Sequence, residues 1–200
     1  VRPAGGMPAP TFCSAARAEA ADEIELLTNI VVLPLHNPVE VAEQAVVLDL
    51  LSGGRFHLGV AVGWRDEEFD AYGIDKSERA GRTVEGIRLL RKLFTERSVT
   101  YEGDIFQVED LDLMPRPAQE SIPIWYGGQS EYAIKRSARM ADAWSMSPIE
   151  TRSELAESAE MYREILEEQD RSYETVRKPL RREAYIAEDD ETAWGEVGPS

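Results

Sequence analysis

The stretch Ile122-Pro-Ile-Trp-Tyr-Gly-Gly-Gln-Ser130 contains the signals of a strand, a tight turn and a capped helix in direct succession. Residues 124–126 are β-branched or aromatic, which predicts a short buried strand. Gly127 and Gly128 let the backbone turn sharply and leave room for a close approach. Ser130 is a favourable N-cap for a helix expected over 132–140, so the stretch predicts one strand–turn–helix unit.

This unit is also a candidate anion site. The turn directs free backbone N–H groups and the positive end of the helix dipole toward one point, and phosphate is the usual anion there. Gly127, Gly128 and Ser130, with the intervening Gln129, are therefore candidate binding residues. The alternative is a plain turn in which the glycines serve only the sharp bend.

Strand and helix signals alternate along the rest of the chain, which predicts an α/β protein with a parallel sheet. Strands are expected near 24–33, 55–62, 122–126, 143–146 and 182–187. Helices are expected near 11–21, 38–52, 66–72, 77–94 and 132–140, from an N-cap at Ser153 onward, and from 189 onward. A hairpin expected near 99–108 interrupts the alternation, so we expect it outside the sheet.

The strand expected over 55–62 separates large from small side chains. Its large residues alternate with His57, Gly59, Ala61 and Gly63, so large and small residues occupy opposite faces. The large face should pack against helices. The small face leaves space, as the inside of a barrel must if a flat ring is to rest across its mouth, unless small residues merely match bulky neighbours.

That pattern favours a (β/α)8 TIM-barrel fold over a doubly wound open sheet. About five parallel strands are too few to close a barrel, so the prediction is an incomplete barrel with an inserted hairpin. We expect residues 1–200 to form a single barrel domain that is truncated at both ends.

Composition narrows the classes of partner. The formal net charge of −16 argues against nucleic acid and anionic membranes. A single cysteine, Cys13, excludes an internal disulfide and indicates a reducing, cytoplasmic setting. No apolar run is long enough to span a membrane. No metal site is predicted.

Several ordered motifs resemble the bacterial luciferase-like monooxygenase family, which includes FMN-dependent monooxygenases and deazaflavin (F420)-dependent reductases and dehydrogenases. They are Leu33-Pro-Leu-His-Asn-Pro38, Leu48-Asp-Leu-Leu-Ser-Gly-Gly-Arg-Phe56, Leu58-Gly-Val-Ala-Val-Gly-Trp64, Arg79-Ala-Gly-Arg82, Tyr101-Glu-Gly103, Pro115-Arg-Pro117, Ile124-Trp-Tyr-Gly-Gly128 and Ala141-Asp-Ala-Trp144. The resemblance runs from about Pro10 to Trp194. Family proteins are longer at both ends, which implies that the first two barrel strands and the eighth are missing here.

The resemblance implies a cofactor site for F420 or FMN. The cofactor phosphate would bind at Gly127, Gly128, Gln129 and Ser130, and the ring would rest near Val62 and Gly63. Many members carry a non-proline cis peptide that presses on the ring, expected here at Ile30-Val31 or a neighbouring bond.

The implied chemistry is oxygenation of a small organic substrate by reduced flavin, or hydride transfer with the deazaflavin. A general acid or base is then needed. Glu67, Glu68 and His36 are the candidate catalytic residues among those present, although several family members take this group from an early strand. Each candidate also has a structural interpretation: His36 as a loop residue, and the glutamates as a solvated helix start.

Two other functions remain open at this stage. One is a non-redox phosphate-binding barrel enzyme, such as an isomerase or aldolase. The other is a non-catalytic cofactor-binding protein of the same fold. For the full-length protein we expect a small-molecule substrate and a homodimer.

Overall fold

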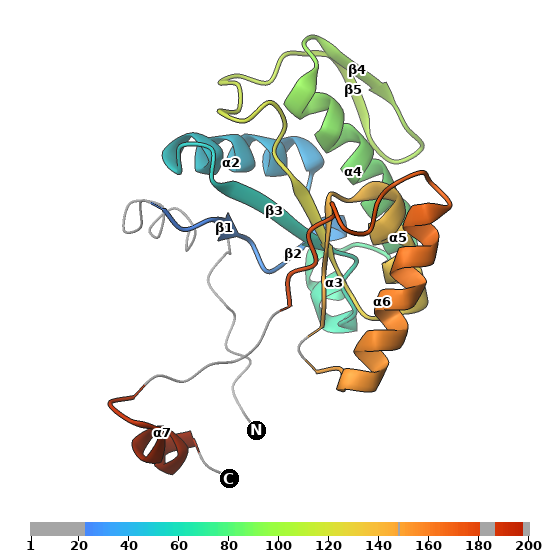
Figure 1. The fold of residues 1–200 in the computed structure, drawn as a ribbon. Helices are drawn as coiled ribbons and strands as arrows, with labels where there is room; N and C mark the ends of the chain where they lie inside the picture. Colours follow the sequence, from blue (N-terminus) through green and yellow to red (C-terminus); the bar gives the residue numbers. More distant parts are fainter. Residues whose placement is uncertain (1–22, 148, 181–186, 198–200) are drawn as a thin grey trace.

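A computed structural model describes residues 23–147, 149–180 and 187–197 of the chain (Figure 1). The helix expected over 11–21 and nearly all of the strand expected over 182–187 lie outside these ranges.

The central sheet is parallel, and its strands follow one another in chain order. β1 (Leu26–Leu27) and β2 (Val31–Val32) both pair with β3 (Phe56–Ala61). β3 pairs with β6 (Ile124–Gly127), and β6 pairs with β7 (Ala143–Ser145). This order confirms the barrel-type sheet and excludes the doubly wound alternative, whose strand order reverses.

The single strand expected over 24–33 is instead two short strands, because the chain leaves the sheet at Thr28. The Thr28 hydroxyl donates to the carbonyl of Gly59 at 3.2 Å and accepts from the N–H of Gly59 at 2.9 Å. The Thr28 side chain therefore pairs with the N–H and C=O groups of Gly59, which in a continuous strand pair with backbone groups of the neighbouring strand. The peptide bond Asn29–Ile30 is cis, and it neighbours Ile30–Val31, so the expected cis peptide is confirmed.

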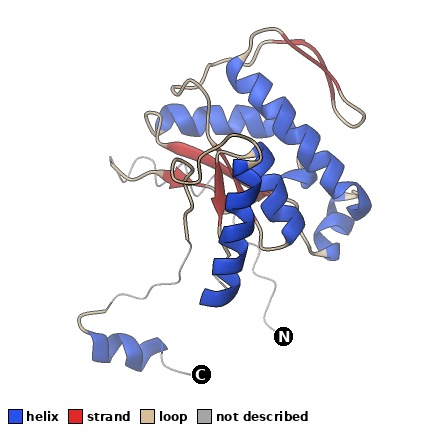
Figure 2. Ribbon diagram, turned by 45° about the vertical axis from the view of Figure 1, so that its right-hand side comes forward, coloured by secondary structure: helices blue, strands red, loops and turns tan. Residues whose placement is uncertain are grey.

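The helices from α2 to α6 lie beside the strands, as expected from the alternation (Figure 2). They are α2 (Pro38–Leu51), α3 (Asp66–Tyr72), α4 (Arg79–Thr95), α5 (Glu131–Met140) and α6 (Arg152–Glu167), with 3-10 turns η1 (Leu33–Leu35) and η2 (Lys76–Glu78). A further helix, α7 (Asp190–Val197), lies apart from the sheet (Figure 1). The prediction of Ser153 as the cap of α6 is wrong. Thr151 is the N-cap, because its hydroxyl accepts from the N–H of Glu154 and the Glu154 carboxylate accepts from the N–H of Thr151.

The expected hairpin is confirmed as an antiparallel pair outside the central sheet. β4 (Val99–Glu102) pairs with β5 (Gln107–Leu111) in a sheet of their own. The buried Glu85 of α4 holds this hairpin in place, because its carboxylate accepts from the N–H groups of Ile105 and Phe106 at 3.0 and 3.1 Å.

The large face of β3 packs into the main core, as predicted. Phe56, Leu58 and Val60 are buried with residues of α2 and α4. The small face does not leave open space at Gly59. A Cβ there would lie 1.9 Å from the carbonyl oxygen of Thr28, so this glycine is required by the close approach of a neighbouring segment rather than by a ligand.

Candidate functional site

The candidate site lies where the strands end. Because β2, β3 and β6 run parallel, their carboxyl ends meet at one edge of the sheet, where α/β proteins place their ligands. The turns that leave this edge contain most of the residues predicted to bind a cofactor.

Gly127 and Ile30 meet at this edge, although they come from distant parts of the chain. A Cβ on Gly127 would lie 2.4 Å from the Cδ1 atom of Ile30. Gly127 is buried and Ile30 is half-buried. Ile30 can occupy this position only because Gly127 has no side chain. The structure thus brings together two residues that were predicted to bind the cofactor.

Gly128 has a φ of +146° and packs against the first turn of α5. A Cβ on Gly128 would lie 2.6 Å from the Cβ of Ala133. The Trp144 Nε1–H group donates to the Gly128 carbonyl at 2.9 Å, and the Ser147 hydroxyl donates to the Gln129 side-chain oxygen at 2.7 Å. Both contacts fix the turn that leads into α5.

The N-terminus of α5 is the place where the sequence predicts an anion site. The Ser130 hydroxyl accepts from the N–H of Ala133 at 3.3 Å, which confirms the predicted N-cap. Glu131 points to solvent and pairs with Lys135. Among the described residues, no acceptor is paired with the backbone N–H of Gln129 or Ser130. The turn thus offers open amides beside the positive end of a helix dipole.

The residues predicted to lie near the ring are divided between two sides of the sheet. Val31 pairs in register with Val60, and both are buried in the helix-facing core. Gly63 has a φ of +74°, and a Cβ there would lie 2.5 Å from Val32 Cγ1. Val62 is half-buried at the same strand end. The structure thus places Ile30, Val62 and Gly63 at the edge but turns the Val31 side chain into the core.

The three candidate acid–base residues follow the carboxyl ends of β2 and β3. His36 is half-buried with its ring edge against Tyr72 of α3, at a centroid distance of 5.8 Å. Burial lowers the pKa of His36, and the charge of Glu40 opposes this shift. Glu67 is exposed and Glu68 half-buried in the first turn of α3. Within the described part of the chain, no hydrogen bond or ion pair joins His36 to either glutamate.

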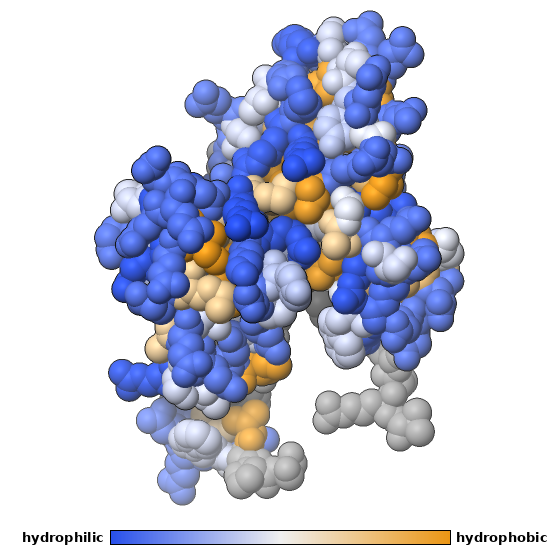
Figure 3. Space-filling model, turned by 90° about the vertical axis from the view of Figure 1, so that its right-hand side faces the viewer, coloured by the Kyte–Doolittle hydropathy of each residue, from blue (hydrophilic) through white to orange (hydrophobic). Residues whose placement is uncertain are grey.

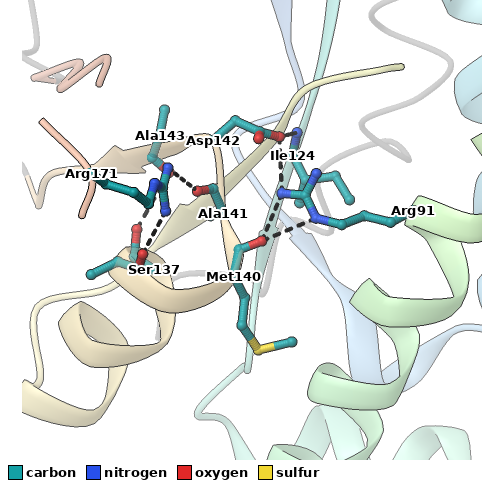
Figure 4. Close-up of polar contacts among 9 residues, drawn as sticks. Arg91, Ile124, Ser137, Met140, Ala141, Asp142, Ala143 and Arg171 are labelled. Carbon is teal, nitrogen blue, oxygen red and sulfur yellow. Dashed lines mark hydrogen bonds and ion pairs between the residues drawn. The ribbon is translucent and has the colours of Figure 1, made fainter. Parts of the chain in front are cut away.

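Sequence reasoning missed the residues that hold these turns. The Asp142 carboxylate accepts from the N–H of Ile124 at 2.8 Å and from Arg91 at 3.1 Å (Figure 4). Arg91 also donates to the Met140 carbonyl. The motif Ala141-Asp-Ala-Trp144 contributes to the family resemblance, but its structural role is visible only in these contacts. Asp142 fixes the start of β6, and Trp144 fixes the turn after β6.

The sheet order and the covering helices define a protein of the (β/α)-barrel type, with the candidate site at the strand ends. The chain belongs to the luciferase-like monooxygenase family, whose sequence model matches residues 2–199. This match confirms the family resemblance that the motifs indicate.

Two of the matched relatives are named as monooxygenases of stated substrates. A 4-hydroxyprotoasukamycin monooxygenase of Streptomyces nodosus subsp. asukaensis is 38% identical over 118 residues, which covers 58% of this chain and 32% of that protein. An FMNH(2)-dependent dimethylsulfone monooxygenase of Pseudomonas putida is 32% identical over 127 residues, with 62% of this chain and 35% of that protein covered. The chain therefore spans about a third of the length of these two relatives.

Solved structures show the same fold. The monooxygenase RslO1 from Streptomyces bottropensis superposes with a TM-score of 0.84 at 23% identity, covering 96% of this chain and 59% of that one. An F420-dependent secondary alcohol dehydrogenase in complex with an F420–acetone adduct gives a TM-score of 0.77 at 22% identity, covering 87% and 53%. Among the described helices of this chain, none has the length and apolar character needed to cross a bilayer.

Proposed function

We propose that the intact protein is an oxidoreductase that uses FMN or F420 to oxygenate a small organic substrate or to exchange hydride with it. The observation that carries this proposal is the contact of Ile30 with Gly127 beside the open N-terminus of α5. The flat ring of the cofactor needs an apolar surface, and its phosphate needs N–H donors nearby. Ile30 beside Gly127 would provide the first, and the start of α5 would provide the second.

The residues present fit the cofactor. The amides of Gln129 and Ser130 would hold the phosphate, while Ile30, Val62 and Gly63 would lie near the ring. Val31 would act indirectly, because its burial in the core anchors the segment that positions Ile30. When bound, the cofactor supplies the redox chemistry, and the protein supplies orientation and proton transfer.

We assign proton transfer to His36, with Glu67 and Glu68 as the other candidates. Burial lowers the pKa of His36, so the ring is neutral near pH 7 and can accept a proton. Both relatives described above are named as monooxygenases, and the name of one of them states that it depends on FMNH(2), so oxygenation with reduced FMN is the first candidate. Hydride transfer with F420 is the second candidate, supported by the fold shared with the F420-dependent dehydrogenase.

We further propose that the intact protein is a cytoplasmic homodimer. The outer side of α2 supports association, because Val47, Leu50 and Leu51 are 48%, 42% and 59% exposed on a helix that is apolar on most sides. The single cysteine supports a reducing compartment.

The proposal is tested by titrating the intact protein with FMN, F420 and riboflavin, with bound absorbance as the measurement. Riboflavin is the matched control because it has the ring of FMN without the phosphate. FMN should bind at least tenfold more tightly than riboflavin if the α5 terminus holds a phosphate. Equal affinity for FMN and riboflavin would place the anion site elsewhere. If neither FMN nor F420 binds, a non-redox barrel enzyme is favoured. If a cofactor binds but the protein turns over no substrate, a non-catalytic cofactor-binding protein is favoured.

A further inference from the structure

A cleft of about 920 Å³ lies between α4 and α5. Its walls contain six basic side chains and a single acidic one, Asp142. The basic residues are Arg88, Arg91, Lys135, Arg136, Arg139 and Arg171. This cluster is unexpected in a chain with a net charge of −16.

Most of this positive charge is not balanced locally. Arg91 pairs with Asp142 at 3.1 Å, and Lys135 pairs with Glu131. Among the described residues, no carboxylate lies within ion-pair distance of the remaining four arginines of the cleft. Clustered like charges disfavour the folded state, and an anionic ligand would relieve that repulsion.

Two of these four arginines are held in place by neutral groups. Arg171 donates to the carbonyls of Ala138 and Ala141 at 2.6 and 3.0 Å (Figure 4). Arg136 donates to the Tyr126 hydroxyl at 3.1 Å. Neutral acceptors fix the guanidinium groups without cancelling their charge. Less ordering entropy is then lost when an anion binds.

The other two arginines, Arg88 and Arg139, are exposed at the cleft. Five of the six cations are arginines, whose planar forks bind phosphate in a bidentate manner. Tyr132 adds an aromatic ring that is 76% exposed. The volume is that of a metabolite site. The face in Figure 3 is mostly hydrophilic, with apolar residues in small separate patches.

We propose that this cleft binds a small polyanion that carries two or more phosphate groups. The site is separate from the cofactor turn: it is lined by the helix faces of α4 and α5, and none of the residues from 127 to 130 lines it. The proposal is independent of the oxidoreductase function.

The test uses calorimetric titration of the intact protein with inorganic triphosphate, first without a cofactor and then with an excess of FMN or of F420. The test variant is Arg88→Gln with Arg139→Gln, which changes the two exposed arginines and leaves Arg91, Arg136 and Arg171 in place. The control variant is Arg97→Gln with Arg152→Gln, which removes the same charge from exposed positions outside the cleft.

We expect triphosphate to bind in the presence of the cofactor, with at least tenfold weaker affinity in the test variant and less than twofold change in the control. Three results would overturn the proposal: no binding at millimolar triphosphate, equal weakening in both variants, or displacement by the cofactor. Hexaglutamate provides a further arm, and tighter binding of this acidic peptide than of triphosphate would assign the cleft to carboxylates instead.

Discussion

Thr28 and Gly59 are joined by two hydrogen bonds that use a single hydroxyl group. The Thr28 hydroxyl donates to the Gly59 carbonyl and accepts from the Gly59 N–H, both within the buried interior. A Cβ on Gly59 would lie 1.9 Å from the Thr28 carbonyl oxygen. The pair therefore fixes how closely the segment between β1 and β2 approaches β3, and with it the position of Ile30.

The first prediction concerns this contact. Gly59→Ala should lower the free energy of unfolding by about 3 kcal/mol, because the new methyl group meets backbone that cannot move aside. Gly195→Ala in α7 is the control, since a Cβ there meets nothing within 4 Å, and it should be neutral or slightly stabilising. Denaturant unfolding of the intact protein provides the measurement. Similar stability of both variants would contradict the close approach.

The second prediction concerns Ile30 and Gly127. Gly127→Ala should weaken FMN or F420 binding by about tenfold, because its methyl group displaces the Cδ1 atom of Ile30. Ile30→Val removes that atom, so the double variant should recover most of the lost affinity. Cofactor titration of the single and double variants measures the coupling. Additive losses would show that the two residues do not interact at the cofactor site.

Gly128→Val is a less selective test, because its added side chain meets Ala133 of α5 as well as any ligand. We expect it to lower both cofactor affinity and thermal stability. Gly127→Ala should change the melting temperature far less, since the displaced group is the flexible end of a side chain.

The third prediction separates helix capping from ligand binding. Ser130→Ala should lower stability by about 1 kcal/mol by removing the cap of α5. Thr151→Ala should lower stability by about the same amount at α6. Only Ser130→Ala should also weaken cofactor binding, which paired melts and titrations would reveal. Equal cofactor affinity in the two variants would show that the Ser130 side chain does not contribute to cofactor binding.

The fourth prediction is a loss of stability as the pH falls below 6.5. Burial lowers the pKa of His57 below 6.5, although Glu25, 3.4 Å from its Nε2 atom, opposes this shift. Burial also lowers the pKa of His36. The unfolded chain therefore binds these protons at a higher pH than the folded chain. The stabilisation is complete above 6.5 and is lost as the pH falls from 6.5 through the folded pKa values.

The chain has only two histidines, so their contributions can be separated. His57→Phe preserves packing against Trp125, and His36→Phe preserves packing against Tyr72. Each variant should lose part of the pH dependence, and the double variant should lose nearly all of it. Urea unfolding at several pH values measures this effect. An unchanged pH profile in the double variant would assign the titration to other groups.

Local signals determined much of the architecture. Strand–helix alternation predicted the parallel order of β3, β6 and β7, and the turn residues Glu102-Gly103-Asp104 predicted the hairpin that lies outside it. The bounds of α3 and the cap at Ser130 followed from residues close in sequence. Such features depend on backbone preferences and on contacts within a few residues, which a sequence displays directly.

The tertiary structure alone decided how these elements serve the site. It divided the first expected strand at Thr28, placed Ile30 against Gly127, turned Val31 into the core and assigned Gly128 to the packing of α5. It also brought the arginines of α4 and α5 to one cleft. Apart from the contact of Gly128 with Ala133, these arrangements bring together segments that are distant in the chain. Hydrophobic periodicity tells which face is buried, but only the packing of the whole sheet and its helices fixes which atoms then meet.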